Sequence, residues 1–459
     1  MVTTAILLFT RDLRVHDHPA LTAALDRAEV VLPLFVFDRA ILASRYAAPN
    51  RVAQLHDAVT DLRAALRARG GELLVRHGDT LTEVRRLAEA HAADELHLTE
   101  EVSGHGRRRA DALRRMAEEE LGGRLSVHEH DGVSVVPAGE VRPTGGDHFK
   151  VFTPYWRRWV EVPRRDPLPA PDRIPCPPGA DAGSMPDLAE LTDTTRLAPE
   201  LPPGGEVAAR ERMTWWFDGP VDDYDDRRNL LAEDGTSKLS HHLHLGTLSA
   251  TELATRVDRR RPGQEVFLQE LCWRDFNHQM LAARPDLVHT DIRTRGDRWR
   301  DDPDDIDAWR QGRTGYPVVD AAMRQLVREG WMHNRARMIT ASFLTKHLYV
   351  DWRVGAWHFM DHLIDGDLAN NFGQWQWTAG TGTDSRPNRI FNPVTQSERY
   401  DPDGVYLRRY VPELAGVDPG HLHAPWEAAG TLLDTASDYP PPIVDHREAR
   451  ERFLAARGA

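Results

Sequence analysis

Residues 315–344, GYPVVDAAMRQLVREGWMHNRARMITASFL, and residues 363–393, LIDGDLANNFGQWQWTAGTGTDSRPNRIFNP, decide the fold of the C-terminal part of this chain. In the first stretch the apolar residues from Val319 to Leu326 recur at helical spacing, which predicts a helix with one apolar face. Both stretches also concentrate polar and aromatic side chains, among them Trp375 and Trp377, at a density too high for a plain core. Together they predict a helical region that carries a functional site.

The N-terminal part of the chain follows a different pattern. Before residue 130, short apolar runs alternate with amphipathic stretches of helical spacing, whereas strand patterns nearly vanish after residue 206. This alternation predicts a doubly wound, Rossmann-like parallel sheet, although no GxGxxG fingerprint follows the first strand. The predicted strands are 5–9, 30–37, 72–77, 95–99 and 125–130.

A proline-rich stretch separates the two patterns. Eleven prolines fall between Pro163 and Pro203, a density that cannot sustain a long helix or a central strand. We therefore predict an α/β domain over residues 1–130, a long interdomain linker over 131–205, and an all-α domain over 206–459.

Composition excludes several classes of protein. The 459 residues contain no apolar run of 18 and no charged-then-apolar leader, so we expect a soluble, cytoplasmic protein without a membrane span. Cys176 and Cys272 are the only cysteines, which excludes a disulfide framework and a four-thiolate cluster. Because the net charge is -13, any site for nucleic acid has to be a local arginine patch.

Two segments carry polar groups that have both a structural and a functional interpretation. In GTSKLSHHLHLGTLS (235–249), the hydroxyls of Thr236, Ser237 and Ser240 are placed either to cap a helix or to hold a phosphate. In Phe267–Ala282 an apolar stripe covers one face, while Glu270 and residues three, four and seven positions later share another. Glu270 is therefore either a solvated helix carboxylate or part of a site.

Over almost its whole length the chain resembles the photolyase/cryptochrome flavoproteins, specifically the class I cyclobutane pyrimidine dimer photolyases. WMHNRARMITASFL, DGDLANN, WQW and RIFNP follow the pattern of that family nearly residue for residue, and RDLRVHDHPAL (11–21) resembles its N-terminal signature. The resemblance implies an antenna-chromophore domain at the N-terminus and an FAD-binding catalytic domain at the C-terminus.

The resemblance also implies how FAD is held. Arg337 would pair with Asp365 beside the flavin, and Asn371 would face the flavin nitrogen that gains or loses a proton as the redox state changes. An Asn at that position favours the repair branch, in which the flavin is fully reduced and anionic. The implied FAD-binding residues are Tyr224, Thr236, Ser237, Lys238, Leu239, Ser240, Arg337, Asp365, Asp367 and Asn371.

A second implied set binds damaged DNA. Aromatic rings would stack on a flipped-out dimer, and a protonated Glu270 would donate a hydrogen bond to its carbonyls, which requires that burial raise the pKa of this carboxyl. The (6-4) photolyases have His at the position of Asn334, so this chain resembles the cyclobutane type. The implied catalytic residues are Glu270, Asn334, Asn371, Trp273, Met338 and Trp377, and the implied DNA-binding residues are Arg274, Trp273, Arg335 and Arg389.

The resemblance further implies an electron-transfer chain and an antenna. Electrons would pass from the surface at Trp309 through Trp352 to Trp375 and photoreduce the flavin. The local match for an 8-hydroxy-5-deazaflavin antenna is Phe35, Asp38, Arg51 and Glu101. Methenyltetrahydrofolate, a flavin antenna and an empty pocket remain alternatives.

We therefore expect a monomeric enzyme that uses light and reduced FAD, and no metal, to split cyclobutane pyrimidine dimers in UV-damaged DNA. A cryptochrome-type photoreceptor without repair activity is the alternative from another class. A light-independent flavin electron-transfer protein would leave the base-stacking tryptophans unexplained.

Overall fold

The computed structural model describes residues 3–177, 179–429 and 438–458. The chain forms two compact units, each built from more than one segment. The first comprises Met1–Leu197, Pro202–Asp222 and Ser237–Pro285, and the second comprises Ala198–Leu201, Asp223–Thr236 and Asp286–Ala459. The helical region after residue 205 is thus shared between the units. The division into domains 1–130, 131–205 and 206–459 remains a prediction from the sequence.

A five-stranded parallel sheet forms the centre of the first unit, in the order β3-β2-β1-β4-β5. The expected doubly wound α/β fold is confirmed. The strand order reverses between β1 and β4, and folds of this kind bind ligands at the carboxyl ends of the strands beside such a point. The strands are β1 (Thr4–Leu8), β2 (Val30–Asp38), β3 (Leu74–Gly78), β4 (Glu95–Thr99) and β5 (Ser126–His130).

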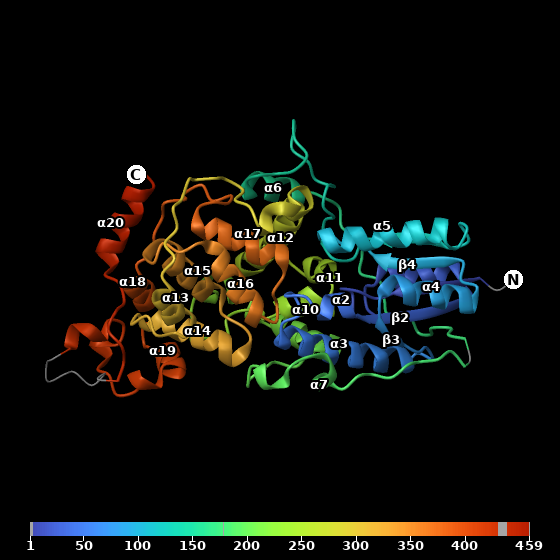
Figure 1. Ribbon diagram of the computed structural model, residues 1–459, viewed down its shortest axis with the longest axis horizontal. Helices are drawn as coiled ribbons and strands as arrows, with labels where there is room; N and C mark the ends of the chain where they lie inside the picture. Colours follow the sequence, from blue (N-terminus) through green and yellow to red (C-terminus); the bar gives the residue numbers. More distant parts are fainter. Residues whose placement is uncertain (1–2, 178, 430–437, 459) are drawn as a thin grey trace. The chain divides into compact units, whose positions relative to one another are not determined.

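Helices cover both faces of the sheet (Figure 1). Helices α1 and α3 pack on the face that includes Leu7 and Val31, and α4 and α5 pack on the face that includes Ile6 and Leu34. Because β1 and β2 are buried on both faces, their apolar residues follow one another without alternation. The helices of this layer are α1 (Pro19–Arg27), α2 (Arg39–Leu42), α3 (Pro49–Arg67), α4 (Thr80–His91) and α5 (Gly104–Glu119).

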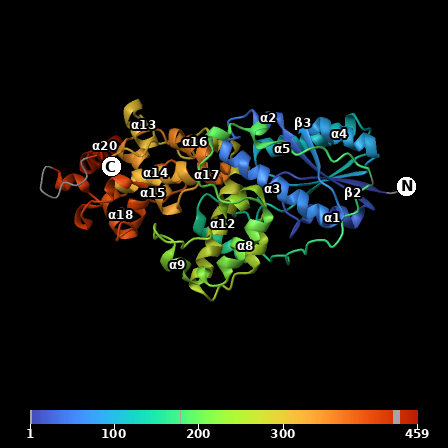
Figure 2. The same ribbon diagram turned by 90° about the horizontal axis from the view of Figure 1, so that it is seen from below.

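The other regular elements of the first unit are helices. Helix α8 lies beside α12 (Figure 2), and the rings of Trp216 and Phe217 meet that of Phe267 at centroid distances of 5.5 and 6.0 Å. The described part of the Pro163–Pro203 stretch contains only the short helical turns α7 and η1. The elements are α6 (Phe152–Trp159), α7 (Leu188–Leu191), η1 (Thr194–Arg196), α8 (Gly205–Phe217), α10 (Ser240–Leu245), α11 (Ala250–Thr255) and α12 (Pro262–Ala283).

A buried arginine joins the sheet to these helices. The Arg14 guanidinium donates to the carbonyl oxygens of Gly246 (2.9 Å), Asp17 (2.8 Å) and Gly132 (3.2 Å). Gly246 has a φ of +69°, and a Cβ there would lie 1.9 Å from the carbonyl oxygen of Arg11. Only glycine fits so close an approach of two backbones. Three segments far apart in the sequence therefore meet around one cation.

The second unit consists of helices and confirms the helical C-terminal part expected from the sequence (Figure 2). The first residues of one of its helices account for the end of the RIFNP motif. Asn392 of RIFNP caps α18 by accepting from the Val394 amide at 3.0 Å, and Pro393 occupies the first helical position. The elements are α9 (Tyr224–Arg227), α13 (Pro303–Arg310), α14 (Pro317–Glu329), α15 (Asn334–Ser342), the π-helical turn η4 (Phe343–His347), α16 (Trp352–His362), α17 (Leu368–Ala379), α18 (Pro393–Tyr400), α19 (Val405–Tyr410) and α20 (His446–Ala456).

Across the described residues, no helix has the length and apolar character that crossing a membrane would require.

Candidate functional site

An ion pair connects α15 to the loop before α17. Arg337 Nη2 donates to Asp365 Oδ2 at 2.8 Å, and Arg337 Nε donates to the Met332 carbonyl, also at 2.8 Å. The Asp365 side chain is nearly buried, whereas that of Arg337 stays one quarter exposed. A buried carboxylate needs such a partner, because an unpaired charge would be strongly destabilising. The pairing expected from the sequence is present.

The first turn of α17 fixes the orientation of two polar side chains. Asp367 caps the helix and accepts from the backbone amide of Asn370 at 2.9 Å and from its side chain at 2.8 Å. Asn371 donates its side-chain NH₂ to the Ala356 carbonyl at 2.9 Å. Because the NH₂ group is engaged there, the Asn371 carbonyl oxygen is held in one direction as an acceptor.

The turn from Ser237 to Ser240 has an unusual backbone. Lys238 adopts a left-handed φ of +52°, which costs a non-glycine residue about 1 kcal/mol or more. The turn is held because Arg212 Nε donates to the Ser237 carbonyl at 2.8 Å. Ser240 is exposed and Lys238 is half-buried. Strain of this kind is often found at ligand sites.

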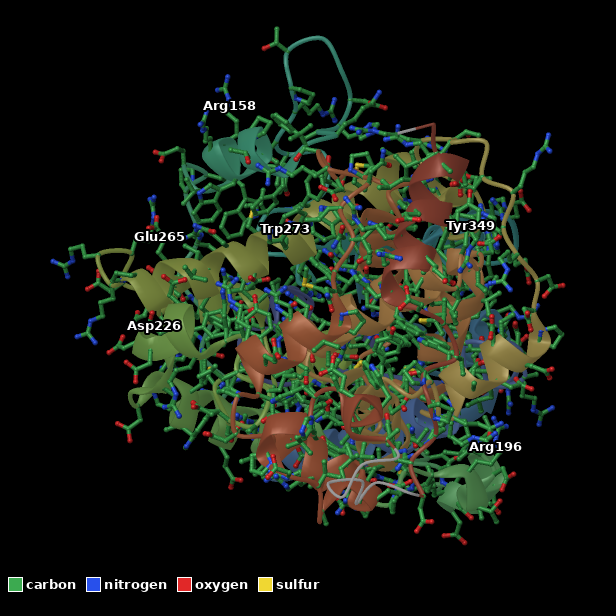
Figure 3. All side chains as sticks on the ribbon, turned by 90° about the vertical axis from the view of Figure 1, so that its left-hand side faces the viewer. Arg158, Arg196, Asp226, Glu265, Trp273 and Tyr349 are labelled. Atoms are coloured by element: carbon green, nitrogen blue, oxygen red, sulfur yellow. The ribbon has the colours of Figure 1, made fainter. Side chains whose placement is uncertain are left out.

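Helix α12 presents Glu270 and Trp273 one turn apart on one face. The Trp273 ring stacks on Phe152 of α6, with centroids 3.7 Å apart and planes 3° from parallel. Figure 3 labels Trp273 and Glu265 at different points along α12. Trp273 is half-buried, so part of its ring is still exposed. The packing fixes the plane of this aromatic ring before any ligand arrives.

In the second unit, α15 and α17 carry the other residues of the expected substrate pocket. Asn334 is exposed at the first position of α15, and Met338 follows four residues later on the same face. Trp377 is half-buried, and the guanidinium of the exposed Arg389 lies 5.2 Å from its ring centroid. Glu270 and Trp273 belong to the first unit, so the pocket that would unite all five remains a prediction.

Two arginines expected to contact DNA have partners within the protein. Arg274 donates to the Val133 carbonyl at 2.7 Å and to the Leu243 carbonyl at 3.2 Å, and its side chain is only 11% exposed. Arg335 donates to Asn229 Oδ1 at 2.7 and 3.0 Å, and burial lowers its pKa. These contacts give both residues a structural role, and their contact with DNA remains a prediction.

The tryptophans differ from expectation at one position. Trp309 was expected at the surface, but it is fully buried on the apolar side of α13, together with Ile306 one turn earlier. Its ring centroid lies 6.1 Å from that of Trp375. The prediction that Trp309 is the surface end of the electron-transfer chain is therefore wrong. The i, i+3 spacing of Ile306 and Trp309 is the sequence signal for this core position.

Trp375 and Trp352 are both buried and lie on neighbouring helices. At Gly355 of α16, a Cβ would lie 2.1 Å from the Trp375 ring, so the ring rests directly on the helix backbone. Trp352 donates its indole N–H to Asp291 Oδ1 at 3.0 Å, and the Arg353 guanidinium lies 4.5 Å from its ring centroid. Asp291 and Arg353 thus hold Trp352 in a polar, charged environment.

Trp299 is a residue that the sequence interpretation missed. It is half-buried, and its ring lies 5.1 Å from that of Tyr349, three residues before Trp352. The next residue, Arg300, donates its backbone amide to the Tyr349 carbonyl at 2.8 Å, which keeps the two segments together. The sequence signal is the run Asp297–Asp302, in which Trp299 stands among charged residues and is an unlikely core residue.

Lys346 is the second residue missed. Its side-chain nitrogen donates to the carbonyl oxygens of Arg389 (2.5 Å) and Pro387 (3.2 Å), and so fastens the loop that carries Arg389. Burial lowers the pKa of this amine to about 7. Only three of the 58 Lys and Arg residues are lysine, so Lys346 stands out in the sequence by its residue type. Lysine offers a compact group that loses its proton when buried, which arginine does not.

The four expected antenna residues lie in the first unit. Asp38 ends β2 and Glu101 follows the end of β4, whereas Phe35 lies within β2 and Arg51 in the first turn of α3. Phe35 is a core residue of β2, with its ring 5.0 Å from that of Phe37. The other three bond within the protein: Asp38 accepts from Thr80, Arg51 donates to the Tyr46 carbonyl, and Glu101 accepts from Arg109 and Ser103. The core position of Phe35 was not expected, and an antenna site remains a prediction.

Comparison with known proteins identifies the class to which this fold and these residues belong. A family model described as "DNA photolyase" matches residues 5–172, and one described as "FAD binding domain of DNA photolyase" matches residues 267–459. A deoxyribodipyrimidine photo-lyase of Streptomyces griseus is 52% identical over 460 residues, covering 100% of both chains. The chain belongs to the photolyase/cryptochrome family.

Solved structures agree over the full length. A bacterial class III photolyase from Agrobacterium tumefaciens is 33% identical with a TM-score of 0.91, covering 100% of this chain and 98% of its own. An archaeal photolyase from Sulfolobus tokodaii with two FAD molecules is 28% identical with a TM-score of 0.86, covering 99% of this chain and 100% of its own. The C-terminal part of the chain is therefore an FAD-binding domain of the photolyase type.

The buried amine of Lys346 predicts a pH dependence of stability. Its folded-state pKa of about 7 lies below the ordinary value of 10.5, so the unfolded chain binds more protons between these values and stability rises with pH. We expect the free energy of unfolding of wild type, relative to Lys346→Met, to increase by about 2 kcal/mol from pH 7 to pH 9. Urea unfolding at both pH values measures this difference.

The exposed Lys150 provides a matched control. The difference between wild type and Lys150→Met should not change between the two pH values. Parallel pH profiles for wild type and Lys346→Met would contradict the lowered pKa.

Proposed function

We propose that this protein repairs cyclobutane pyrimidine dimers in UV-damaged DNA with light and reduced, anionic FAD. The observation that carries the proposal is the combination of an FAD-binding domain with exposed or half-buried Glu270, Trp273, Asn334, Met338 and Trp377. The full-length relative from Streptomyces griseus, named as a deoxyribodipyrimidine photo-lyase, supports it. The subclass expected from the sequence, class I, remains a prediction, since a class III photolyase is also similar over the whole length.

The residues of the second unit fit an isoalloxazine ring, whose polar edge offers donors and acceptors. The Asn371 carbonyl oxygen, held in one direction by the bond to Ala356, is suited to accept from a flavin N–H. The Arg337–Asp365 ion pair holds a guanidinium and a carboxylate side by side. Tyr224, Asp367 and the turn from Thr236 to Ser240 complete the proposed FAD site. When bound and excited by light, the cofactor supplies an electron to the dimer.

The proposed substrate site uses flat surfaces and few charges. Trp273, already stacked on Phe152, and Trp377, beneath Arg389, would receive the flipped-out bases of the dimer. Asn334 and Glu270 would hydrogen-bond the pyrimidine edges. Arg389, exposed beside Trp377, is the best placed of the expected arginines to contact a phosphate. The protein thus supplies orientation, and no residue is needed as a nucleophile.

For the electron path that restores the reduced flavin, we propose a revised order. Trp299 is the partly exposed entry, and Trp352 and Trp375 follow toward the interior. Tyr349 supports this order because it touches Trp299 and precedes Trp352 by three residues.

An antenna chromophore is proposed at the carboxyl ends of the sheet strands, where folds of this type bind ligands. The family resemblance favours 8-hydroxy-5-deazaflavin, with methenyltetrahydrofolate as the alternative. The Sulfolobus tokodaii photolyase, which holds two FAD molecules, keeps a second flavin as a further choice.

Repair of two oligonucleotides tests the proposed substrate. We expect reduced protein in light to repair a thymine cyclobutane dimer but not a (6-4) product, with no repair in the dark. Glu270→Ala should lower the yield about tenfold, as expected for one lost hydrogen bond to a charged group, and leave FAD bound.

Glu265→Ala on the same helix is the matched control and should repair like wild type. If FAD-containing protein repaired neither oligonucleotide, the protein would instead be assigned as a photoreceptor. Loss of FAD from Glu270→Ala would show that this residue belongs to the cofactor site.

Single tryptophan variants test the electron path. Trp299→Phe and Trp352→Phe should slow photoreduction of the oxidised flavin roughly tenfold or more, because each removes an oxidisable ring from the path. Both should repair normally after chemical reduction. Light-driven loss of the oxidised-flavin absorption, with an external reductant present, measures the rate.

Trp215→Phe, at an exposed tryptophan of α8, is the control and should photoreduce normally. A loss of photoreduction in Trp309→Phe but not in Trp299→Phe would return the entry to Trp309.

A further inference from the structure

A polar stripe interrupts the parallel sheet where β4 meets the edge strand β5. Glu95 and His97 are two residues apart on β4, so their side chains lie on one face of the sheet. His97 pairs in register with His128 of β5. His97 also pairs with Leu7 on its other side, which belongs to the core under α1 and α3. Sheets covered on both faces ordinarily carry apolar side chains at such positions. His97 is nonetheless fully buried.

Three atoms of this stripe converge. His97 Nε2 lies 2.9 Å and His128 Nε2 lies 4.0 Å from the same oxygen, Glu95 Oε2. One potential ligand atom from each of the three residues lies within 4.8 Å of the other two. His128 Nε2 is buried and has no hydrogen-bond partner among the described residues. Ligands bound at about 2.0–2.1 Å around a tetrahedral ion are roughly 3.3 Å apart, so shifts of about 1 Å would bring these atoms into a coordination sphere.

The surroundings suit a metal ion in two respects. His97 Nδ1 lies 2.9 Å from His130 Nε2, an outer contact of the kind that fixes the ring and tautomer of a metal-binding histidine. The His128 side chain is about one third exposed, which gives an ion a way in and leaves room for water.

One cation competes for the carboxylate. Arg27, at the end of α1, donates Nε and Nη2 to both Glu95 oxygens at 2.7–3.1 Å. Its side chain is half exposed, so the guanidinium has space to turn toward solvent. Arg27 occupies the carboxylate oxygens and does not bond to the imidazole nitrogens of His97 and His128.

We propose that Glu95, His97 and His128 form a binding site for a borderline divalent transition ion such as Zn²⁺. Two imidazoles and one carboxylate are a donor set that zinc accepts with a fourth position left for water. The ion would tie the edge strand β5 to β4. The site is separate from the residues proposed for FAD and DNA, and repair would not require it.

Calorimetry with Zn²⁺ tests the site, using full-length, FAD-containing protein without an affinity tag and after treatment with a chelator. We expect one ion per chain, and binding at least about tenfold weaker in His128→Gln and in Glu95→Gln. His77→Gln is the matched control, because His77 is an exposed histidine on the opposite edge strand, β3. It should bind like wild type, and Arg27→Gln should bind as tightly or more tightly.

Flavin absorption and circular dichroism show whether each variant is folded. Co²⁺ offers a second measurement, because its bands beyond the oxidised-flavin absorption report tetrahedral coordination and should disappear in His128→Gln. Equal zinc affinity in wild type and both ligand variants, or no binding by wild type at micromolar zinc, would overturn the proposal. The cluster would then be a hydrogen-bonded polar stripe only.

Discussion

The buried guanidinium of Arg14 is the interaction on which the first unit depends. Burial disfavours its charge and lowers its pKa, yet Asp12, Asp17 and Glu206 around it favour the charged form. Its N–H groups donate to backbone carbonyls of three segments. Because these acceptors are backbone atoms, substituting the side chains of those residues does not remove them. Truncating Arg14 would leave several buried acceptors unsatisfied, which is far more costly than losing one surface pair. This explains why helices distant in sequence belong to the same unit as the sheet.

Helix α12 owes its position to a similar use of backbone groups. Asp275 accepts from the Val136 amide and from the Trp159 indole, each at 2.9 Å, and Gln279 exchanges two hydrogen bonds with the backbone of Phe149. The inner face of α12 is therefore fastened to the segment after β5. The proposed substrate residues Glu270 and Trp273 lie on another face of the same helix. A site built on such a helix is more precise than one built on loops alone.

Much of this could be predicted from the sequence, because the signals were local. Apolar runs marked the strands to within two residues. The ion pair between Arg337 and Asp365, 28 residues apart, was predicted from the family resemblance together with the cost of burying either charge alone. The surface position of Trp309 was predicted from the family resemblance alone, whereas its spacing from Ile306 indicates the core position that the structure shows. The contacts of Arg274 could not be predicted for a different reason. No local sequence pattern indicates that an arginine will donate to backbone carbonyls more than thirty residues away.

The cluster at the sheet edge was invisible for the same reason. Glu95 and His97 stand more than thirty residues from His128, and only the register of two parallel strands makes them neighbours. The buried role of Lys346 likewise depends on a loop forty residues away, although its rarity in an arginine-rich chain hinted at it. Composition and spacing describe what one segment does, and tertiary register decides which segments meet.

The contact between Trp375 and the backbone at Gly355 has a consequence for evolution and engineering. Tunnelling between aromatic groups weakens steeply as their separation grows, and the missing side chain at Gly355 lets the Trp375 ring rest directly on the backbone of α16. A methyl group at that position would push the ring away or tilt it, without altering any atom that is oxidised or reduced. For the proposed electron path, the position of Trp375 would therefore depend on an absent side chain, at a residue that a search for redox-active side chains would pass over.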